Sequence, residues 1–159
     1  MFGFHRKTDN ALCMPVKGKC MDLSLCTEKA FSEKKLGDGF MVEPQGDTIC
    51  SPCDGWLTMV FPTKHAFGLR MNDGTEVLVH IGIDTVQLGG QHFETLTSAK
   101  RKVKKQTPLI RCDIQKIREL GYDPSVLVIV CGKQGIGKQH LNEYRDVGDI
   151  IIEGSLCES

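Results

Sequence analysis

Short runs rich in β-branched and aromatic residues alternate with turn signals along most of the chain. Turn signals such as Gly37-Asp38-Gly39, Asp54-Gly55 and Asn72-Asp73-Gly74 recur at short intervals. The runs that we expect to form strands are Phe40–Glu43, Trp56–Phe61, His65–Met71, Glu76–Ile83, Leu109–Cys112, Val126–Cys131 and Ile150–Ile152. Strands at this spacing are typical of antiparallel sandwiches and barrels. The pattern therefore predicts an all-β protein, an antiparallel β-sandwich or barrel with one or two short helices.

A single segment, Ile114–Leu120, has helical spacing with suitable ends. Asp113 stands where a helix N-cap is expected and Gly121 lies just past the predicted end. Ile114, Ile117 and Leu120 fall near one face of this helix. We expect residues 11–159 to form one domain and residues 1–10 to form a flexible N-terminal tail. The tail is basic and faintly amphipathic, so any membrane contact should be peripheral at most.

The segment Lys64–Asp84 predicts a hairpin that carries two histidines. Asp73-Gly74 is best read as a two-residue loop, which pairs Phe67 with His80 and His65 with Gly82. The predicted residues on the face of the two histidines are Phe67, Leu69, Met71, Leu78, Gly82 and Asp84, with Val77, Val79, Ile81 and Ile83 facing the core. His65 and His80 then become diagonal neighbours, and Gly82 leaves room beside them. A shift of one residue in the register would separate the two rings across the sheet.

Two imidazoles beside a glycine are compatible with three kinds of site. One ring can act as a nucleophile for a transferable phosphoryl group while the other donates a hydrogen bond to it. The same rings can bind zinc if a third ligand comes from elsewhere. They can also be ordinary histidines on a half-buried sheet. Spacing alone leaves these alternatives open.

Composition and charge exclude several other classes. The chain has 159 residues, with 20 Lys and Arg balanced by 20 Asp and Glu. Zero net charge argues against a polyanion binder that works through bulk charge. The longest apolar runs, such as Val126–Cys131, are too short to cross a bilayer, and the N-terminus lacks the apolar core of a signal peptide. We therefore expect a cytoplasmic protein.

The 8 cysteines do not form a recognisable metal or redox motif. Only Cys50 and Cys53 have C-x-x-C spacing, and no second such pair completes a zinc site. We expect reduced thiols that fill the core as small apolar groups.

Two further segments suggest nucleotide or nucleic-acid binding, and neither fits well. Lys100–Lys105 is strongly basic but has no interleaved aromatic residues, so we expect a solvated hairpin and no nucleic-acid partner. Residues 132–139 follow a strand and almost match a P-loop. Gln139, however, stands where the motif needs a Ser or Thr hydroxyl for magnesium.

The residues around His80 resemble the active-site signature of enzyme IIA of the glucose class, from the bacterial phosphoenolpyruvate-dependent sugar phosphotransferase system. The segment Gly74-Thr-Glu-Val-Leu-Val-His80-Ile-Gly82-Ile-Asp84-Thr85-Val86 fits that signature without a gap. Further segments that resemble the family are PVKGK (15–19), FSEKKLGDGFMVEP (31–44), SPCDGWL (51–57), TKHAF (63–67), VKK (103–105) and DIQKIRELGYDPS (113–125). The resemblance thus extends over nearly the whole chain.

The resemblance implies a specific function. Family members have a β-sandwich or barrel fold, accept a phosphoryl group from the phosphocarrier HPr and pass it to a cysteine on the IIB domain of a sugar permease. His80 matches the histidine that is phosphorylated on Nε2, and His65 matches the histidine that steadies the phosphoryl group. Thr63 matches a threonine that orients His65. No cofactor is required, although zinc can bind adventitiously at His65 and His80.

The resemblance also implies a docking surface for the partner proteins. Phe31, Phe61, Leu78 and Val86 match its apolar rim. Asp84 and Glu28 match acids that would attract a basic patch on HPr. The family often has Val-Pro-Asp where this chain has Cys26-Thr27-Glu28, so this loop should differ.

Two other functions stay open beside the phosphocarrier. A zinc hydrolase could use His65, His80 and Asp84, although the sequence contains no H-x-H or H-E-x-x-H pattern. A regulatory protein could instead sense sugar supply by binding other proteins. We expect a free-standing IIA protein, and a piece of a longer permease is the alternative. In either case the membrane partner would select the sugar.

Overall fold

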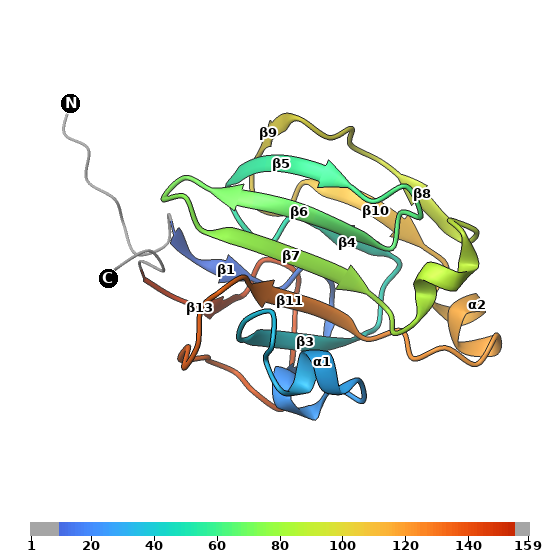
Figure 1. The fold of residues 1–159 in the computed structure, drawn as a ribbon, viewed down its shortest axis with the longest axis horizontal. Coiled ribbons are helices and arrows are strands. Elements are labelled where there is room, and N and C mark those ends of the chain that lie inside the picture. The colour runs from blue at the N-terminus through green and yellow to red at the C-terminus, as the bar shows by residue number, and fades with distance from the viewer. Residues whose placement is uncertain (1–9, 155–159) are drawn as a thin grey trace.

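Antiparallel β-sheets make up most of the computed structural model, which describes residues 10–154 (Figure 1). The main sheet runs in the order β12 (Glu143–Arg145), β2 (Gly18–Asp22), β3 (Gly39–Pro44), β11 (Val126–Val130), β7 (Glu76–Ile81), β6 (Ala66–Met71), β5 (Gly55–Val60) and β9 (Arg101–Val103). A three-stranded sheet has the order β4 (Thr48–Cys50), β10 (Pro108–Cys112) and β8 (Phe93–Thr95), and β1 (Leu12–Cys13) pairs with β13 (Ile150–Ile152). The predicted all-β fold is confirmed.

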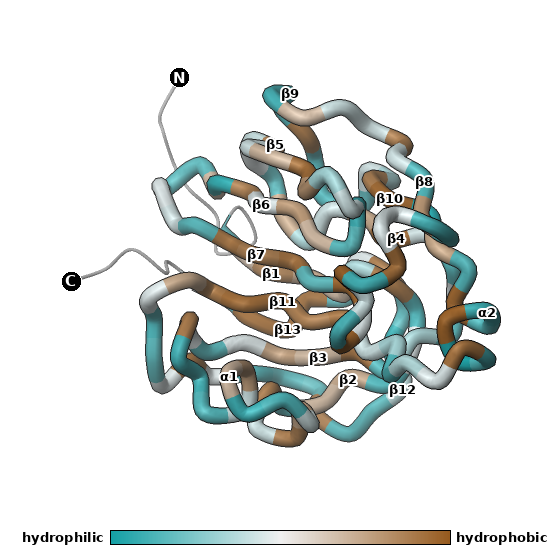
Figure 2. Tube along the Cα trace, turned by 45° about the vertical axis from the view of Figure 1, so that its right-hand side comes forward, coloured by the Kyte–Doolittle hydropathy of each residue, from teal (hydrophilic) through white to brown (hydrophobic). Residues whose placement is uncertain are grey.

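Strand β11 lies in the middle of the main sheet and is buried on both faces. Val126, Val128 and Val130 point into the core between the sheets, whereas Leu127 and Ile129 belong to a second apolar cluster. That cluster lies under a segment after β2 that contains the 3-10 turn η2 (Leu23–Leu25) and the helix α1 (Lys29–Ser32). The brown colour along β7 and β11 in Figure 2 follows this burial. The continuous apolar run of β11 is therefore explained by a cover on each face.

The predicted helix is present as α2 (Ile114–Glu119). The Asp113 side chain accepts a hydrogen bond from the backbone N–H of Lys116, as expected for an N-cap. Ile114 and Ile117 are buried, but Leu120 is 45% exposed because it lies at the C-cap, outside the helix. The apolar stripe predicted for the helix is therefore wrong at its last position.

The hairpin between β6 and β7 differs from the prediction by one residue in register. Ala66 pairs with His80, and Leu69 pairs with Val77. The loop has three residues, since Met71 and Thr75 close it and Gly74 adopts a φ of 91°. A three-residue loop of this kind places a glycine in the left-handed region. The residues Phe67, Leu69 and Met71 consequently face the core with Val77, Val79 and Ile81, contrary to the prediction.

Other parts of the sequence were predicted incompletely. Residues 100–105 do not form a hairpin, since Arg101–Val103 is an edge strand that pairs with β5. Segment 132–139 leads from β11 to β12, so the helix that a P-loop requires does not follow it.

Six of the cysteines in residues 10–154 are buried free thiols, and Cys131 is exposed. Burial raises the pKa of the Cys53 thiol to about 12, which fits an apolar filling role.

No helix within residues 10–154 is long and apolar enough to span a bilayer. The predicted N-terminal tail lies outside the described residues, apart from Asn10, and so does Cys157.

Candidate active site

His65 and His80 lie side by side on the outer face of the main sheet. Their ring centroids are 4.8 Å apart and the rings are nearly perpendicular, at 83°. The predicted proximity is confirmed, although it was derived from the wrong register. His65 precedes the first residue of β6 and follows Lys64, whose φ is 60°. The alternation of side chains within the strand therefore does not determine where His65 points.

A hydrogen bond to the backbone fixes the ring of His80. Its Nδ1 lies 2.8 Å from the carbonyl oxygen of Gly82. A carbonyl oxygen only accepts, so Nδ1 carries the proton and Nε2 of the neutral ring has a free lone pair. Gly82 is held in turn, because its N–H donates to the Ser125 carbonyl at 2.8 Å. No signal in the sequence pointed to this contribution of Ser125.

The backbone conformation at position 82 requires a glycine, whereas open space beside the rings does not explain it. Its φ is 80°, and a Cβ at this position would lie 2.4 Å from Cγ2 of Thr85. Thr85 is fully buried and donates its hydroxyl to the Ile81 carbonyl. The expectation that Gly82 leaves room beside the rings is therefore wrong, since Thr85 occupies the place that a side chain at position 82 would take.

Thr63 contacts His65 directly. Its hydroxyl oxygen lies 2.6 Å from Nδ1 of His65. Thr63 belongs to a tight turn, in which the Lys64 N–H donates to the Phe61 carbonyl at 2.8 Å. The contact agrees with what the family resemblance implied for Thr63.

Both histidines are biased towards the neutral form. Burial, and then the neighbouring His65 ring, lower the pKa of His80 to about 4, while the Gly82 carbonyl and Asp84 act in the opposite direction. Burial also lowers the pKa of His65, which is only 4% exposed. At about pH 7 both rings are therefore uncharged. A neutral imidazole with a free Nε2 is the nucleophilic form.

Two aromatic rings flank the histidine pair. The ring centroids of Phe31, in α1, and His80 are 5.0 Å apart, and those of Phe61 and His65 are 5.5 Å apart. Phe31 is 8% exposed and belongs to the second apolar cluster, against which Leu78 also packs. These contacts place the imidazoles in an apolar setting.

The other predicted docking residues lie on segments next to the histidines. Asp84 is exposed, has a φ of 61° and begins the turn η3 (Thr85–Leu88), in which Val86 is 50% exposed. Glu28 is the N-cap residue of α1, although its side chain makes no cap hydrogen bond. The altered loop before Glu28 therefore still leads into the helix that carries Phe31.

Among residues 10–154, no group of three or more His, Cys, Asp or Glu side chains is arranged to hold a metal ion. His65, His80 and Asp84 thus do not form the three-ligand set that a zinc hydrolase would use.

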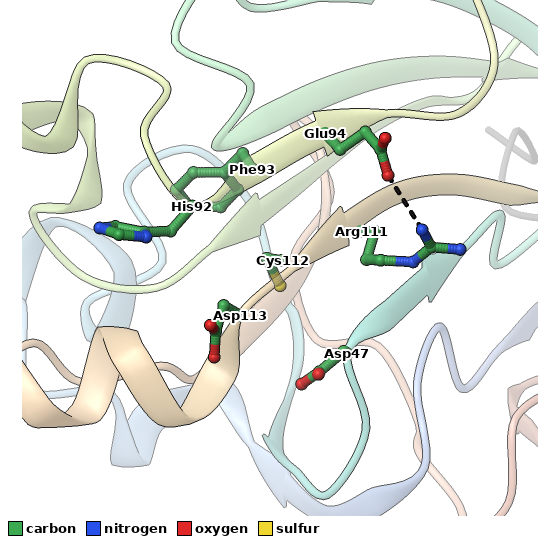
Figure 3. Close-up of a pocket in the computed structure, with 7 residues that line it drawn as sticks. All are labelled: Asp47, His92, Phe93, Glu94, Arg111, Cys112 and Asp113. Carbon is green, nitrogen blue, oxygen red and sulfur yellow. Dashed lines mark hydrogen bonds and ion pairs between the residues drawn. The ribbon is translucent and has the colours of Figure 1, made fainter.

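A separate cleft of about 380 Å³ lies at the three-stranded sheet and the start of α2 (Figure 3). The residues that line it are Asp47, His92, Phe93, Glu94, Arg111, Cys112 and Asp113. Arg111 is paired with Glu94 at 3.0 Å, and Asp113 caps α2. The cleft thus contains charged groups that already have partners, and we assign it no chemistry.

Comparisons with known proteins agree on one kind of protein. The sequence model of the family described as phosphoenolpyruvate-dependent sugar phosphotransferase system, EIIA 1, matches residues 10–136. A glucose-specific EIIA component of Staphylococcus epidermidis is 39% identical over 92% of this chain and 90% of its own length. The glucose permease IIA of Mycoplasma capricolum has a similar structure, with a TM-score of 0.81, 29% identity and coverage of 96% of this chain and 99% of the other.

Longer relatives match over only part of their length. A glucose-specific EIICBA component of Staphylococcus carnosus is 38% identical over 76% of this chain but over 18% of its own length. A beta-glucoside-specific EIIBCA component of Bacillus subtilis is 38% identical over 79% of this chain and 21% of its own length. The chain therefore spans about a fifth of the length of these relatives.

Proposed function

Because the chain belongs to the EIIA 1 family of the phosphoenolpyruvate-dependent sugar phosphotransferase system, we propose that it is a phosphocarrier that works through a phosphohistidine at His80. It accepts the phosphoryl group from phospho-HPr in the cytoplasm and passes it to the IIB domain of a glucose-class sugar permease. The observation that carries this proposal is the hydrogen bond from Nδ1 of His80 to the Gly82 carbonyl, which leaves Nε2 as the nucleophile.

Each transfer exchanges one bond to phosphorus for another. The Nε2 lone pair of His80 forms a bond to phosphorus as the bond between phosphorus and the carrier group of phospho-HPr breaks. In the second step a cysteine thiolate of the IIB domain attacks the same phosphorus, and the N–P bond to His80 breaks. Little covalent chemistry falls to the protein, so positioning and electrostatic stabilisation dominate. Throughout both steps the proton stays on Nδ1 of His80, which continues to donate its hydrogen bond to the Gly82 carbonyl.

His65 is the proposed hydrogen-bond donor to the phosphoryl oxygens. When the Thr63 hydroxyl donates to Nδ1 of His65, the proton of the neutral ring lies on Nε2. An N–H that is oriented in advance stabilises the charge of the transferring group without further reorganisation. Thr63 is thus a positioning residue, which sets the tautomer of His65.

The apolar surroundings protect the intermediate. Phe31 and Phe61 flank the two rings, and Leu78 packs against the second cluster. A dry rim disfavours attack by water on the phosphohistidine. We propose that the same rim, with Val86, contacts the partner proteins, while Asp84 and Glu28 attract a basic surface on HPr.

The names of the longer relatives support a IIB partner, since they combine A, B and C components in one protein. HPr as donor follows from the family alone. The proposal requires no cofactor, leaves the sugar to the membrane partner, and allows regulatory binding by the same surface.

Incubation with phosphoenolpyruvate, enzyme I and HPr, followed by intact mass spectrometry, tests the proposal. The wild-type chain should gain one phosphoryl group in an acid-labile, base-stable linkage. His80→Ala should gain none, whereas the matched variant His92→Ala should behave like the wild type. A phosphoryl group on His80→Ala would overturn the assignment.

A further inference from the structure

An ion cluster connects segment 132–139 to the residues on either side of α1. Nζ of Lys138 lies 2.5 Å from Oδ1 of Asp22 and 2.6 Å from Oδ1 of Asp38, and the Lys138 side chain is only 4% exposed. Lys34 also lies near both acids, at 3.8 Å from Asp22 and 3.1 Å from Asp38. The cluster therefore contains two carboxylates and two ammonium groups, with no net charge.

The two acids lie at the two ends of one segment. Asp22 is the last residue of β2 and caps η2, since its carboxylate accepts from the Ser24 N–H at 3.2 Å. Asp38 comes immediately before β3. Between them lie residues 23–37, which we call the cover segment and which contain η2 and α1. Lys138 thus bridges both ends of the cover segment.

Backbone contacts connect the same two regions. The Oδ2 atom of Asp38 accepts from the Ile136 N–H at 2.9 Å, and the Asp38 N–H donates to the Lys133 carbonyl at 2.7 Å. Gln134 donates its side-chain amide to the Lys34 carbonyl at 2.8 Å. Segment 132–139 is therefore bound along much of its length to residues 34–38.

The cover segment reaches the histidine pair through Phe31. Leu23, Cys26 and Phe31 of this segment belong to one apolar cluster with Met41, Leu127 and Ile129 of the sheet and with Ile83, which follows β7. The Phe31 ring contacts His80, with 5.0 Å between centroids. In Figure 1, α1 lies against the sheet beside β3. A shift of the cover segment would therefore change the surroundings of the reacting ring.

We propose that Lys138 is a positioning residue for phosphoryl transfer, which holds both ends of the cover segment so that Phe31 stays against His80. The role rests on the proposed phosphocarrier function, and it gives segment 132–139 a place in the reaction. Breaking a buried ion pair by removing one partner leaves an uncompensated charge, so the two ends of the segment should loosen when Lys138 is lost. An error of about 1 Å in the position of a catalytic group can lower a rate by about a hundredfold.

Three variants separate this role from simple stabilisation. Lys138→Met removes the bridge, and Lys138→Arg keeps its charge and its donors. Asp22→Asn weakens only one end, because asparagine caps a helix as well as aspartate does. Lys35→Met is the matched control, since Lys35 pairs with Glu33 in the same segment but both side chains are more than half exposed.

The primary measurement is the NMR titration of the His80 ring in variants whose β7 and β11 amide signals show that they are folded. With Phe31 displaced, water reaches the ring, so its pKa should rise from about 4 towards the ordinary value in Lys138→Met, less so in Asp22→Asn. Lys138→Arg and Lys35→Met should titrate like the wild type. If Lys138→Met does not fold, the Asp22→Asn titration decides. An unchanged His80 titration in the folded Lys138→Met protein, or in Asp22→Asn in its place, would overturn the proposal.

Phosphoryl acceptance from HPr provides the second measurement. Lys138→Met should lower kcat/KM by about tenfold to a hundredfold, and Lys138→Arg should restore most of it. The NMR titration needs no phosphoryl donor, so it tests the position of Phe31 even if the wild-type chain accepts no phosphoryl group. Failure of the proposed function and failure of the positioning role are therefore distinguishable.

Discussion

His80 and Gly82 are joined by a hydrogen bond of 2.8 Å from the ring Nδ1 to the backbone carbonyl two residues later. The Gly82 backbone, with a φ of 80°, turns away from the strand just after His80, and its N–H is held by Ser125. Ring orientation and tautomer therefore depend on the end of β7 and not on another side chain. The same turn leads into η3, which contributes Val86 to the proposed docking rim.

The first prediction is that His80 stays neutral in weakly acidic solution. Burial and the adjacent His65 lower its pKa to about 4, against about 6.5 for an unperturbed histidine. The stability that His80 contributes should be fully present above about pH 6.5 and be lost as the pH falls through about 4, because the unfolded chain binds the proton more readily. NMR of the labelled imidazole nitrogens checks this, and a midpoint near 6.5 would contradict it.

A second prediction concerns His65 and its partner Thr63. One preorganised donor contributes about 3 kcal/mol to transition-state stabilisation, so His65→Gln should fold normally and lower the transfer rate by about a hundredfold. Thr63→Val removes the hydroxyl that sets the His65 tautomer and should produce a smaller loss. Thr63→Ser, which keeps the hydroxyl, should restore most of the rate. Rapid-quench measurement of transfer to a IIB domain provides the test, and unchanged rates in His65→Gln would exclude the donor role.

Metal removal distinguishes the phosphocarrier from a zinc hydrolase. Metal binding by histidine requires neutral rings, and both imidazoles are biased towards that form, so the test must include zinc as an adventitious ligand. The proposed transfer uses only side-chain and backbone groups. Phosphoryl acceptance should therefore be the same before and after treatment with EDTA. Activity that EDTA removes and added zinc restores would favour the hydrolase.

The fold class and the central strands could be predicted from the sequence, because short runs of β-branched and apolar residues bounded by turn residues are local signals. The uninterrupted apolar run of β11 is one example, since burial on both faces produces it. Short edge strands such as β12, with the sequence Glu-Tyr-Arg, have no apolar pattern and depend on pairing with β2. Local patterns do not reveal such pairings.

The histidine pair shows a different limit. A turn of three residues in place of two reversed the predicted faces of Phe67 and Leu69, because each step along a strand changes the side. The two rings nevertheless meet, since the irregular turn at Lys64 lies outside the strand. The ion cluster of Lys138, Asp22 and Asp38 could not be predicted either. Lys138 lies 116 positions from Asp22 and 100 positions from Asp38 in the sequence, and no spacing rule connects them.

The last prediction separates the electrostatic and apolar parts of docking. Net charge is zero, so attraction between this chain and HPr must be local. Asp84 is exposed beside the histidine pair, and Glu28 begins the helix that contacts His80. Exposed charges at a rim accelerate encounter and add little to final affinity. Neutralising both acids, as Asp84→Asn with Glu28→Gln, should therefore slow association and weaken its dependence on salt.

Apolar anchors should act on the other rate constant. Phe61 packs beside His65, and buried aromatic anchors mainly govern dissociation, so Phe61→Ala should speed dissociation with little effect on association. Stopped-flow binding to HPr at two ionic strengths measures both rates. The control is Asp146→Asn with Glu153→Gln, which removes the same charge from two exposed acids of the C-terminal segment. If this control slows association as much as the loss of Asp84 and Glu28, overall charge steers the encounter and the local explanation is wrong. If only Asp84 matters, the loop at Cys26 and Thr27 holds Glu28 away from the contact.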